Sequence, residues 1–321
     1  MLYKATEGLF FDHLFLSHSY YLRLIHVTVY FLKIWRKVER GFKRIYRPVL
    51  MRQLEQNNKQ SSCSILNPNG PIVTLTTFGE RISSAFYTIE SIALGDLQPS
   101  RLTLWLNKDE YQHSLPKTLE RLKKRGLDIQ PCTDHGPHKK YLPEVQAYPN
   151  LDIPFVTADD DILYPRYWLK KLNKAYEKNP SNIYCYRAHH IAIQPNADFS
   201  PYKSWKRCLS LSPSHLHFST GDCGVLFPPK MRKILYNSGE NFVDLCPKAD
   251  DIWLNYRAFL AAIPVAQIVK VPKHFYEIPG TRNGALANFN NGLSGNDKQL
   301  LNTYPKSHRQ HLLSITQNTS V

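Results

Sequence analysis

From residue 71 onwards, short apolar runs alternate with stretches in which apolar residues recur every three or four positions. The β-branched run Ile72–Thr76 predicts a buried strand, and Phe86, Ile89 and Ala93 follow at helical spacing. The pattern continues with expected strands at residues 101–106, 127–129 and 153–157 and expected helices around residues 115–122 and 169–176. Strands that alternate with helices predict an α/β fold with a mostly parallel sheet flanked by helices on both faces.

The first 60 of the 321 residues differ from the rest by their charge. They hold 11 Lys/Arg against 4 Asp/Glu, a net +7 of the chain's +15. Charged residues and histidines interrupt the apolar stretch 9–35, so we do not expect it to span a bilayer. Residues 33–52 mix Lys/Arg with aromatic and aliphatic residues in the pattern of a basic amphipathic helix. Such a helix suits an anionic membrane surface, but it equally suits packing on the folded domain or on a second subunit.

These patterns divide the chain into four parts. We expect a basic amphipathic helical segment at 1–60, a polar linker at 61–70, one large α/β domain at 71–305 and a polar tail at 306–321. The N-terminus lacks the features of a cleavable secretory signal, which favours a cytoplasmic protein, with peripheral attachment to the inner face of a membrane if residues 1–60 bind lipid. The six cysteines have no spacing typical of structural zinc and are expected to be reduced, buried thiols.

Three consecutive carboxylates, Asp159, Asp160 and Asp161, follow the apolar run 153–157. Ligands of open α/β sheets bind at the carboxyl ends of the strands, and these aspartates are predicted to lie at such an end. Adjacent carboxylates repel one another, and a divalent cation such as Mn²⁺ or Mg²⁺ would neutralise them. The alternative is an acidic turn that caps the helix beginning near Pro165.

The run PFVTADDDILYPRYWL resembles the DxD region of GT-A glycosyltransferases, in the manner of family-2-like enzymes of bacterial polysaccharide synthesis. The resemblance covers roughly residues 71–305 and implies a Rossmann-like GT-A domain there. It implies that Asp159 contacts the ribose of a nucleotide-sugar donor, that Asp161 binds the metal together with Asp159, and that Asp160 lies between them beside the donor. It also implies Mn²⁺ or Mg²⁺ as the cofactor.

Two further stretches fit the same family. The run PIVTLTTFGERI resembles the first strand and loop that receive the nucleobase, which implies donor contacts from Thr76, Thr77 and Arg81. The run GPHKKYLP precedes the metal strand, where related transferases carry a basic residue near the donor. The resemblance implies that Lys140, or else Lys139, offsets the diphosphate charge.

The acceptor side of the resemblance lies later in the chain. STGDCGVLFPP resembles the small-residue strand and turn beside the acceptor, and KADDIWLNYRAFL resembles the acidic helix start that supplies a general base in inverting members. The implied base is Asp251, with Asp250 as the alternative; common inverting members have Glu-Asp where this chain has Asp-Asp, which leaves the base and the stereochemical outcome open. A late histidine, His274, is the implied further metal ligand.

The resemblance implies a metal-dependent, inverting glycosyltransferase that uses a UDP-sugar and a saccharide or lipid-linked saccharide acceptor in cell-surface polysaccharide or lipopolysaccharide synthesis. Two alternatives stay open. A sugar-1-phosphate nucleotidyltransferase has a similar sheet but a Gly-rich phosphate loop, whereas residues 76–81 hold one glycine. A non-enzymatic basic adaptor would bind polyanions without metal, but the sequence shows no nucleic-acid-binding motif, so nucleic acid is not an expected partner.

Overall fold

The computed structural model describes residues 46–281 and 295–318. The chain divides into two units, residues 1–53 and 54–321. Residues 46–60 are helical, whereas most of the predicted basic amphipathic helix at 33–52 lies outside the described residues. None of the helices in the described part of the chain has the length and apolar composition needed to cross a bilayer.

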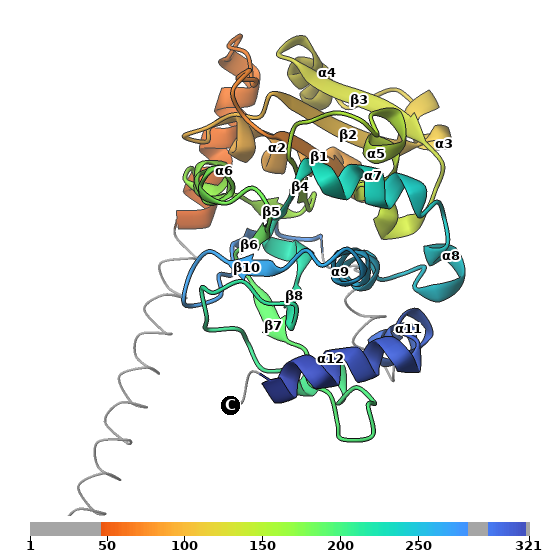
Figure 1. Cartoon of the computed structure of the whole chain (residues 1–321). Helices are drawn as coiled ribbons and strands as arrows, with labels where there is room; N and C mark the ends of the chain where they lie inside the picture. The colour runs from red at the N-terminus through yellow and green to blue at the C-terminus, as the bar shows by residue number, and fades with distance from the viewer. Residues whose placement is uncertain (1–45, 282–294, 319–321) are drawn as a thin grey trace, which may run out of the picture. The chain divides into compact units, whose positions relative to one another are not determined.

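The central element is a sheet of seven strands within the described residues (Figure 1). Its strands are β1 (Ile72–Thr76), β2 (Arg101–Asn107), β3 (Leu127–Cys132), β4 (Phe155–Ala158), β6 (Ile183–Cys185), β9 (Val225–Phe227) and β10 (Val265–Gln267). They lie in the order β10-β6-β9-β4-β1-β2-β3. β9 is antiparallel to its neighbours β4 and β6, and the other neighbouring pairs are parallel. The predicted α/β fold with a mostly parallel sheet is therefore confirmed.

Helices connect the strands and cover both faces of the sheet. The α-helices are α2 (Ala85–Ala93), α3 (Lys108–Gln112), α4 (Lys117–Lys124), α5 (Leu142–Ala147), α6 (Trp168–Lys178), α7 (Pro229–Asn237), α8 (Phe242–Leu245), α9 (Asp250–Leu260), α11 (Gly295–Thr303) and α12 (Lys306–Asn318). The 3₁₀ helices are η1 (Gly79–Ser83), η2 (Gly136–Lys140), η3 (Tyr202–Ser204) and η4 (Gly221–Cys223). Helices α2, α4 and α6 share one hydrophobic core, and α5, α7 and α9 share the other.

Strand β4 shows how one strand serves both cores. Phe155 belongs to the core under α5, α7 and α9, and its neighbour Val156 belongs to the core under α2, α4 and α6. Successive side chains of a strand point to opposite faces, so a strand covered on both sides needs apolar residues at consecutive positions. This requirement explains why the strands appear in the sequence as continuous apolar runs.

Two short antiparallel ribbons stand beside the central sheet. Their strands are β5 (Ile162–Leu163) with β11 (Tyr276–Glu277), and β7 (Ala188–His190) with β8 (His217–Ser219). The first ribbon continues directly from the chain that follows β4, and the second joins β6 to η4. Both ribbons therefore attach segments of the second half of the chain to the carboxyl end of the sheet.

Residues 54–70 pack as part of the compact unit, which differs from the expected linker at 61–70. Ile65 is fully buried in the core with α2 and α4. Upstream, the side-chain amide of Asn58 donates to Glu90 at 2.9 Å, and Arg125 lies 2.5 Å from the same carboxylate oxygen. A few apolar residues in a polar run have no periodicity, so this packing cannot be predicted from the sequence.

The C-terminal residues also differ from the expected polar tail at 306–321, because 306–318 form helix α12. Leu312 is fully buried, and the His311 ring lies 5.3 Å from that of Phe259 on α9, centroid to centroid. Nδ1 of His308 lies 3.1 Å from the Tyr256 hydroxyl. A narrow apolar stripe among polar residues still allows a helix to pack on one side.

Candidate active site

The strand order reverses between β1 and β4. After β1 the chain adds β2 and β3 on one side, and β4 then pairs with the other side of β1. Where the order reverses in this way, the connections leave the two strands in opposite directions, and ligands bind in the gap at their carboxyl ends. Thr77 and η1 follow β1, and Asp159–Asp161 follow β4. Both segments therefore lie at this position.

Arg81 of η1 joins these two segments. Its guanidinium pairs with Asp160 and lies 2.8 Å from a carboxylate oxygen of Asp161. Burial raises the pKa of Asp160, and the Arg81 charge and the Thr77 side chain oppose that rise. The Thr88 hydroxyl lies 2.9 Å from the carbonyl oxygen of Asp160 and so fixes the turn from the side of α2.

Lys140, the last residue of η2, connects the aspartate turn to helix α9. Its Nζ lies 2.6 Å from Oδ1 of Asp159 and 3.2 Å from Oδ2 of Asp250. Burial lowers the pKa of Lys140, but Asp159, Asp250 and Asp251 outweigh it and hold that pKa well above its usual value. Of the two adjacent lysines, Lys140 is therefore the one at the carboxylates, because Lys139 pairs instead with Asn107 and Asp134.

The start of α9 supplies the second acidic pair. The Gly221 main-chain N–H donates to Oδ2 of Asp251 at 3.2 Å. Burial and the neighbouring Asp250 raise the pKa of Asp251 well above its usual value, although Lys140 and the Gly221 N–H oppose the rise. A Cβ on Gly221 would lie 3.0 Å from Asp251 and 3.5 Å from Nζ of Lys140. Glycine therefore lets the η4 backbone approach both charged groups.

Gly224, just after η4, shows a second close approach. Its φ is +81°, and a Cβ there would lie 2.5 Å from the Trp168 ring of α6. The same indole donates from Nε1 to the Cys223 carbonyl oxygen at 2.8 Å. Glycine is required because it tolerates positive φ and leaves room for the ring. This contact fixes η4, and with it Gly221, against α6.

A further ion pair, between Arg187 and Asp222, lies near Asp159. Arg187 pairs with Asp222, and its Nη1 lies 3.5 Å from Nδ1 of His274. Burial raises the pKa of Asp222, Arg187 opposes it, and Asp159 adds to the rise. The sequence did not single out Arg187, although a basic residue that follows the buried strand β6 is the same kind of signal as the aspartates after β4.

The structure brings together residues that the sequence proposed separately. Arg81, Asp159–Asp161, Lys140, Asp250 and Asp251 form one network of ion pairs and neighbouring charges. His274 lies at the edge of this network, where it contacts Arg187. The Thr76 hydroxyl donates to the Trp105 carbonyl oxygen at 2.9 Å, an anchor between β1 and β2. The roles of these residues in donor binding, metal binding and catalysis remain predictions.

The aspartate turn carries carboxylates of the kind that a divalent cation binds. Burial and the repulsion from Asp159 raise the pKa of Asp161 to about 7, even though Arg81 opposes them. One or two carboxylates are the ligands that Mg²⁺ or Mn²⁺ usually takes from a protein when substrate phosphates complete the shell. Asp159 and Asp161 are therefore the residues that could hold the ion, and Arg81 is the cation with which it would compete.

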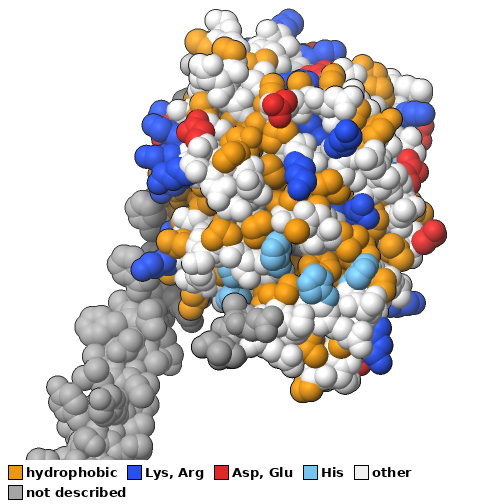
Figure 2. Space-filling view, in the orientation of Figure 1, with side chains coloured by type: hydrophobic (Ala, Val, Ile, Leu, Met, Phe, Trp, Pro, Cys, Tyr) orange, Lys and Arg blue, Asp and Glu red, His pale blue; other side chains and the backbone are white. Residues whose placement is uncertain are grey.

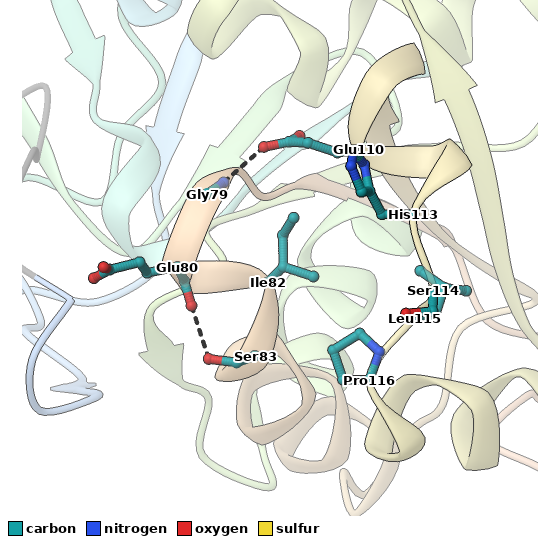
Figure 3. Close-up of a pocket in the computed structure, with 9 residues that line it drawn as sticks. All are labelled: Gly79, Glu80, Ile82, Ser83, Glu110, His113, Ser114, Leu115 and Pro116. Atoms are coloured by element: carbon teal, nitrogen blue, oxygen red, sulfur yellow. Dashed lines mark hydrogen bonds between the residues drawn. The ribbon is translucent and has the colours of Figure 1, made fainter.

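An open hollow of about 710 Å³ lies beside η1 (Figure 3). It is lined by Gly79, Glu80, Ile82 and Ser83 of η1 and by Glu110 and residues 113–116. The Gly79 N–H donates to Glu110 at 2.7 Å across its rim. No aspartate of the turn lines this hollow, so it adjoins the charged network without being part of it.

His138 supports the segment that carries Lys140 and should make stability depend on pH. Its Nε2 lies 2.9 Å from the Cys246 carbonyl oxygen, to which it must donate, so Nδ1 accepts from the Tyr141 hydroxyl at 2.9 Å. The ring is stacked on Phe242. Burial lowers the pKa of His138 to about 4. The imidazole is therefore neutral in the folded protein at neutral pH.

Between pH 6.5 and 4, the unfolded chain binds a proton at this position that the folded chain does not, so stability falls as the pH falls. We expect His138 to account for a loss of about 3 kcal/mol of unfolding free energy across this window. Urea unfolding of His138→Gln at several pH values should show a shallower dependence than wild type. His113→Gln, at an exposed position, is the control and should follow wild type; equal slopes for His138→Gln and wild type would contradict the assignment.

The chain matches no protein-family model and no curated protein. The solved structures to which it is similar include the following two. One is CMP:2-keto-3-deoxy-manno-octonic acid synthetase complexed with CTP, with a TM-score of 0.37 and 11% identity over 70% of this chain and 99% of that one. The other is residues 1–349 of TarS from S. aureus, with a TM-score of 0.42 and 15% identity over 78% of this chain and 74% of that one. At these identities, the likeness concerns the fold alone.

Proposed function

We propose that the chain is a metal-dependent glycosyltransferase that moves a sugar from a nucleoside-diphosphate donor to a saccharide or lipid-linked saccharide acceptor. The observation that supports it is the position of Lys140. This single ammonium group lies between the aspartates after β4 and the acidic start of α9, at the carboxyl edge of the sheet. One side of the network then suits a diphosphate with a metal, and the other suits an acceptor hydroxyl.

On the donor side, positive charge is available where a leaving diphosphate would need it. Arg81 and Lys140 now pair with carboxylates, and both can instead stabilise phosphate oxygens in a site of low water content. Asp159 and Asp161 would hold the divalent cation, which when bound neutralises the departing nucleoside diphosphate. UDP is the expected nucleoside diphosphate, by the resemblance of the sequence to GT-A enzymes.

On the acceptor side, Asp251 is the proposed general base, and Asp250 is its alternative. A base is most effective when its pKa lies nearer the working pH than that of an ordinary carboxylate. Burial and Asp250 raise the pKa of Asp251 above that of an ordinary carboxylate. Asp251 takes the proton from the acceptor hydroxyl while the oxygen of that hydroxyl attacks the anomeric carbon. Attack from the face opposite the leaving group inverts the configuration. Synthesis of a cell-surface polysaccharide or lipopolysaccharide is the proposed setting.

The test is hydrolysis of a panel of nucleotide sugars, with Mn²⁺, with Mg²⁺ and with EDTA. Slow hydrolysis by water needs no acceptor, so we expect metal-dependent release of nucleoside diphosphate from one donor. Release of pyrophosphate from a nucleoside triphosphate with a sugar 1-phosphate would instead identify a nucleotidyltransferase. Neither activity, together with no metal-dependent nucleotide binding, would contradict an enzymatic role and favour the basic adaptor.

A further inference from the structure

A second group of metal-ligating side chains lies on the β7–β8 ribbon, outside the charged network. His190 on β7 and His217 on β8 are directly paired across the ribbon, and Cys208 comes from the loop between the two strands. One ligand atom from each residue lies within 4.8 Å of the others. The Cys208 main-chain N–H donates to the Ala188 carbonyl oxygen at 2.9 Å, which holds the loop against β7.

The geometry of two of these residues agrees with a shared ion. Sγ of Cys208 lies 3.4 Å from Nε2 of His217. Tetrahedral Zn²⁺, with its usual bond lengths to sulfur and nitrogen, would separate these atoms by about 3.6 Å. Nδ1 of His217 lies 3.0 Å from the Val265 carbonyl oxygen and must donate to it, so the lone pair of Nε2 points to the side of Cys208. Histidines that bind metals are oriented by such a bond.

Burial also agrees with a metal site. The side chains of Cys208 and His217 are buried, and His190 is half-buried. Metal binding would require the Cys208 thiol to lose its proton to solvent.

We propose that Cys208, His190 and His217 bind one Zn²⁺, with the fourth position open to water on the side of the half-buried His190. A thiolate with two imidazoles selects Zn²⁺, whereas the all-oxygen aspartate turn suits Mg²⁺ or Mn²⁺. The two sites therefore differ in the metal that they take.

The consequence for the candidate active site follows from the ribbon. Arg187 immediately precedes β7, and Gly221 follows β8 after one intervening residue, Thr220. Arg187 and Gly221 extend from the Ala188–Ser219 end of the ribbon, whereas the His190–His217 pair lies at its other end. An ion that joins the two strands would therefore act on Arg187 and Gly221 only through the ribbon, by holding its strands together.

The test is titration of the untagged, metal-free chain with Co²⁺ as a spectroscopic substitute for Zn²⁺. We expect one equivalent to produce a thiolate-to-Co²⁺ charge-transfer absorption that Zn²⁺ abolishes. The Cys208→Ser variant should lose this absorption. His190→Ala, at a half-buried position, should weaken Co²⁺ binding at least about tenfold.

Two controls identify the thiol and the site. Cys63 is an exposed thiol, so Cys63→Ser should keep the absorption, and Asp161→Asn should keep it as well. Histidine side chains are gathered on the face shown in Figure 2, but imidazoles without a thiolate cannot produce this absorption. Absence of the absorption in wild type, its retention in Cys208→Ser or its loss in Cys63→Ser would overturn the proposal. If Cys208→Ser does not fold, wild type and His190→Ala decide the question.

Discussion

Replacing Asp161 by asparagine is expected to lower the rate of metal-dependent nucleotide-sugar hydrolysis by about 100- to 1,000-fold. The variant keeps the shape of the side chain but removes one of the two carboxylates proposed to hold the cation. Metal stabilisation of a leaving phosphate contributes several kcal/mol, and each 1.4 kcal/mol is a factor of ten in rate. The measurement is nucleoside-diphosphate release against Mn²⁺ concentration, which should also show weaker metal dependence.

Asp96→Asn is the matched control: Asp96 pairs with Arg166 at the surface, so this variant should keep wild-type rates. The alternative role of Asp161 is its ion pair with Arg81. If these aspartates only neutralise Arg81, Asp161→Asn would lower the unfolding free energy and leave the metal dependence of nucleotide binding unchanged. That pair of results would contradict the metal role.

Replacing Asp251 by asparagine is expected to lower sugar transfer to an acceptor by about 10²- to 10⁴-fold, the range typical for loss of a general base. An amide keeps an oxygen that can accept from the Gly221 N–H, so the start of α9 should stay in place. Donor binding should change little, because Asp251 has no part in the proposed metal site. Transfer to a panel of saccharides and equilibrium binding of the donor measure the two effects separately.

The neighbouring Asp250→Asn variant is the comparison that assigns the base. Asp250 pairs with Lys140, so its loss should free the ammonium group for the diphosphate and strengthen donor binding, with little effect on transfer at saturating donor. If Asp250→Asn loses transfer and Asp251→Asn keeps it, Asp250 is the base. If both variants keep transfer, the acidic start of α9 serves only to cap the helix.

The sequence located the first strands closely because local pattern decides them. The expected strand at 72–76 is β1, and the expected strand at 101–106 extends by one residue in β2. The strand expected at 153–157 runs from 155 to 158, a shift toward the aspartates. Side chains of these strands are buried on both faces, so each leaves a continuous apolar run that a single sequence reveals.

The packing at the two ends of the domain was predicted less well from the sequence. Helix α12 and the packed segment around Ile65 were expected as a polar tail and a linker. Each buries only a few side chains among many polar ones, and so small an apolar set is not distinguishable from a solvated segment without knowledge of its neighbours. Their packing depends on surfaces built by other parts of the chain.

For the candidate sites, the sequence by itself determined that acidic residues follow a buried strand and open a later helix. Only the tertiary structure decided that Lys140 lies between Asp159 and Asp250, and that Arg81 pairs with Asp161. Strand order sets these contacts, because the pairing of β1 with β4 brings together, at their carboxyl ends, segments far apart in the chain. The group of Cys208, His190 and His217 could not be predicted from the sequence for the same reason. Its members come together through the pairing of β7 with β8, a long-range contact that residue spacing does not encode.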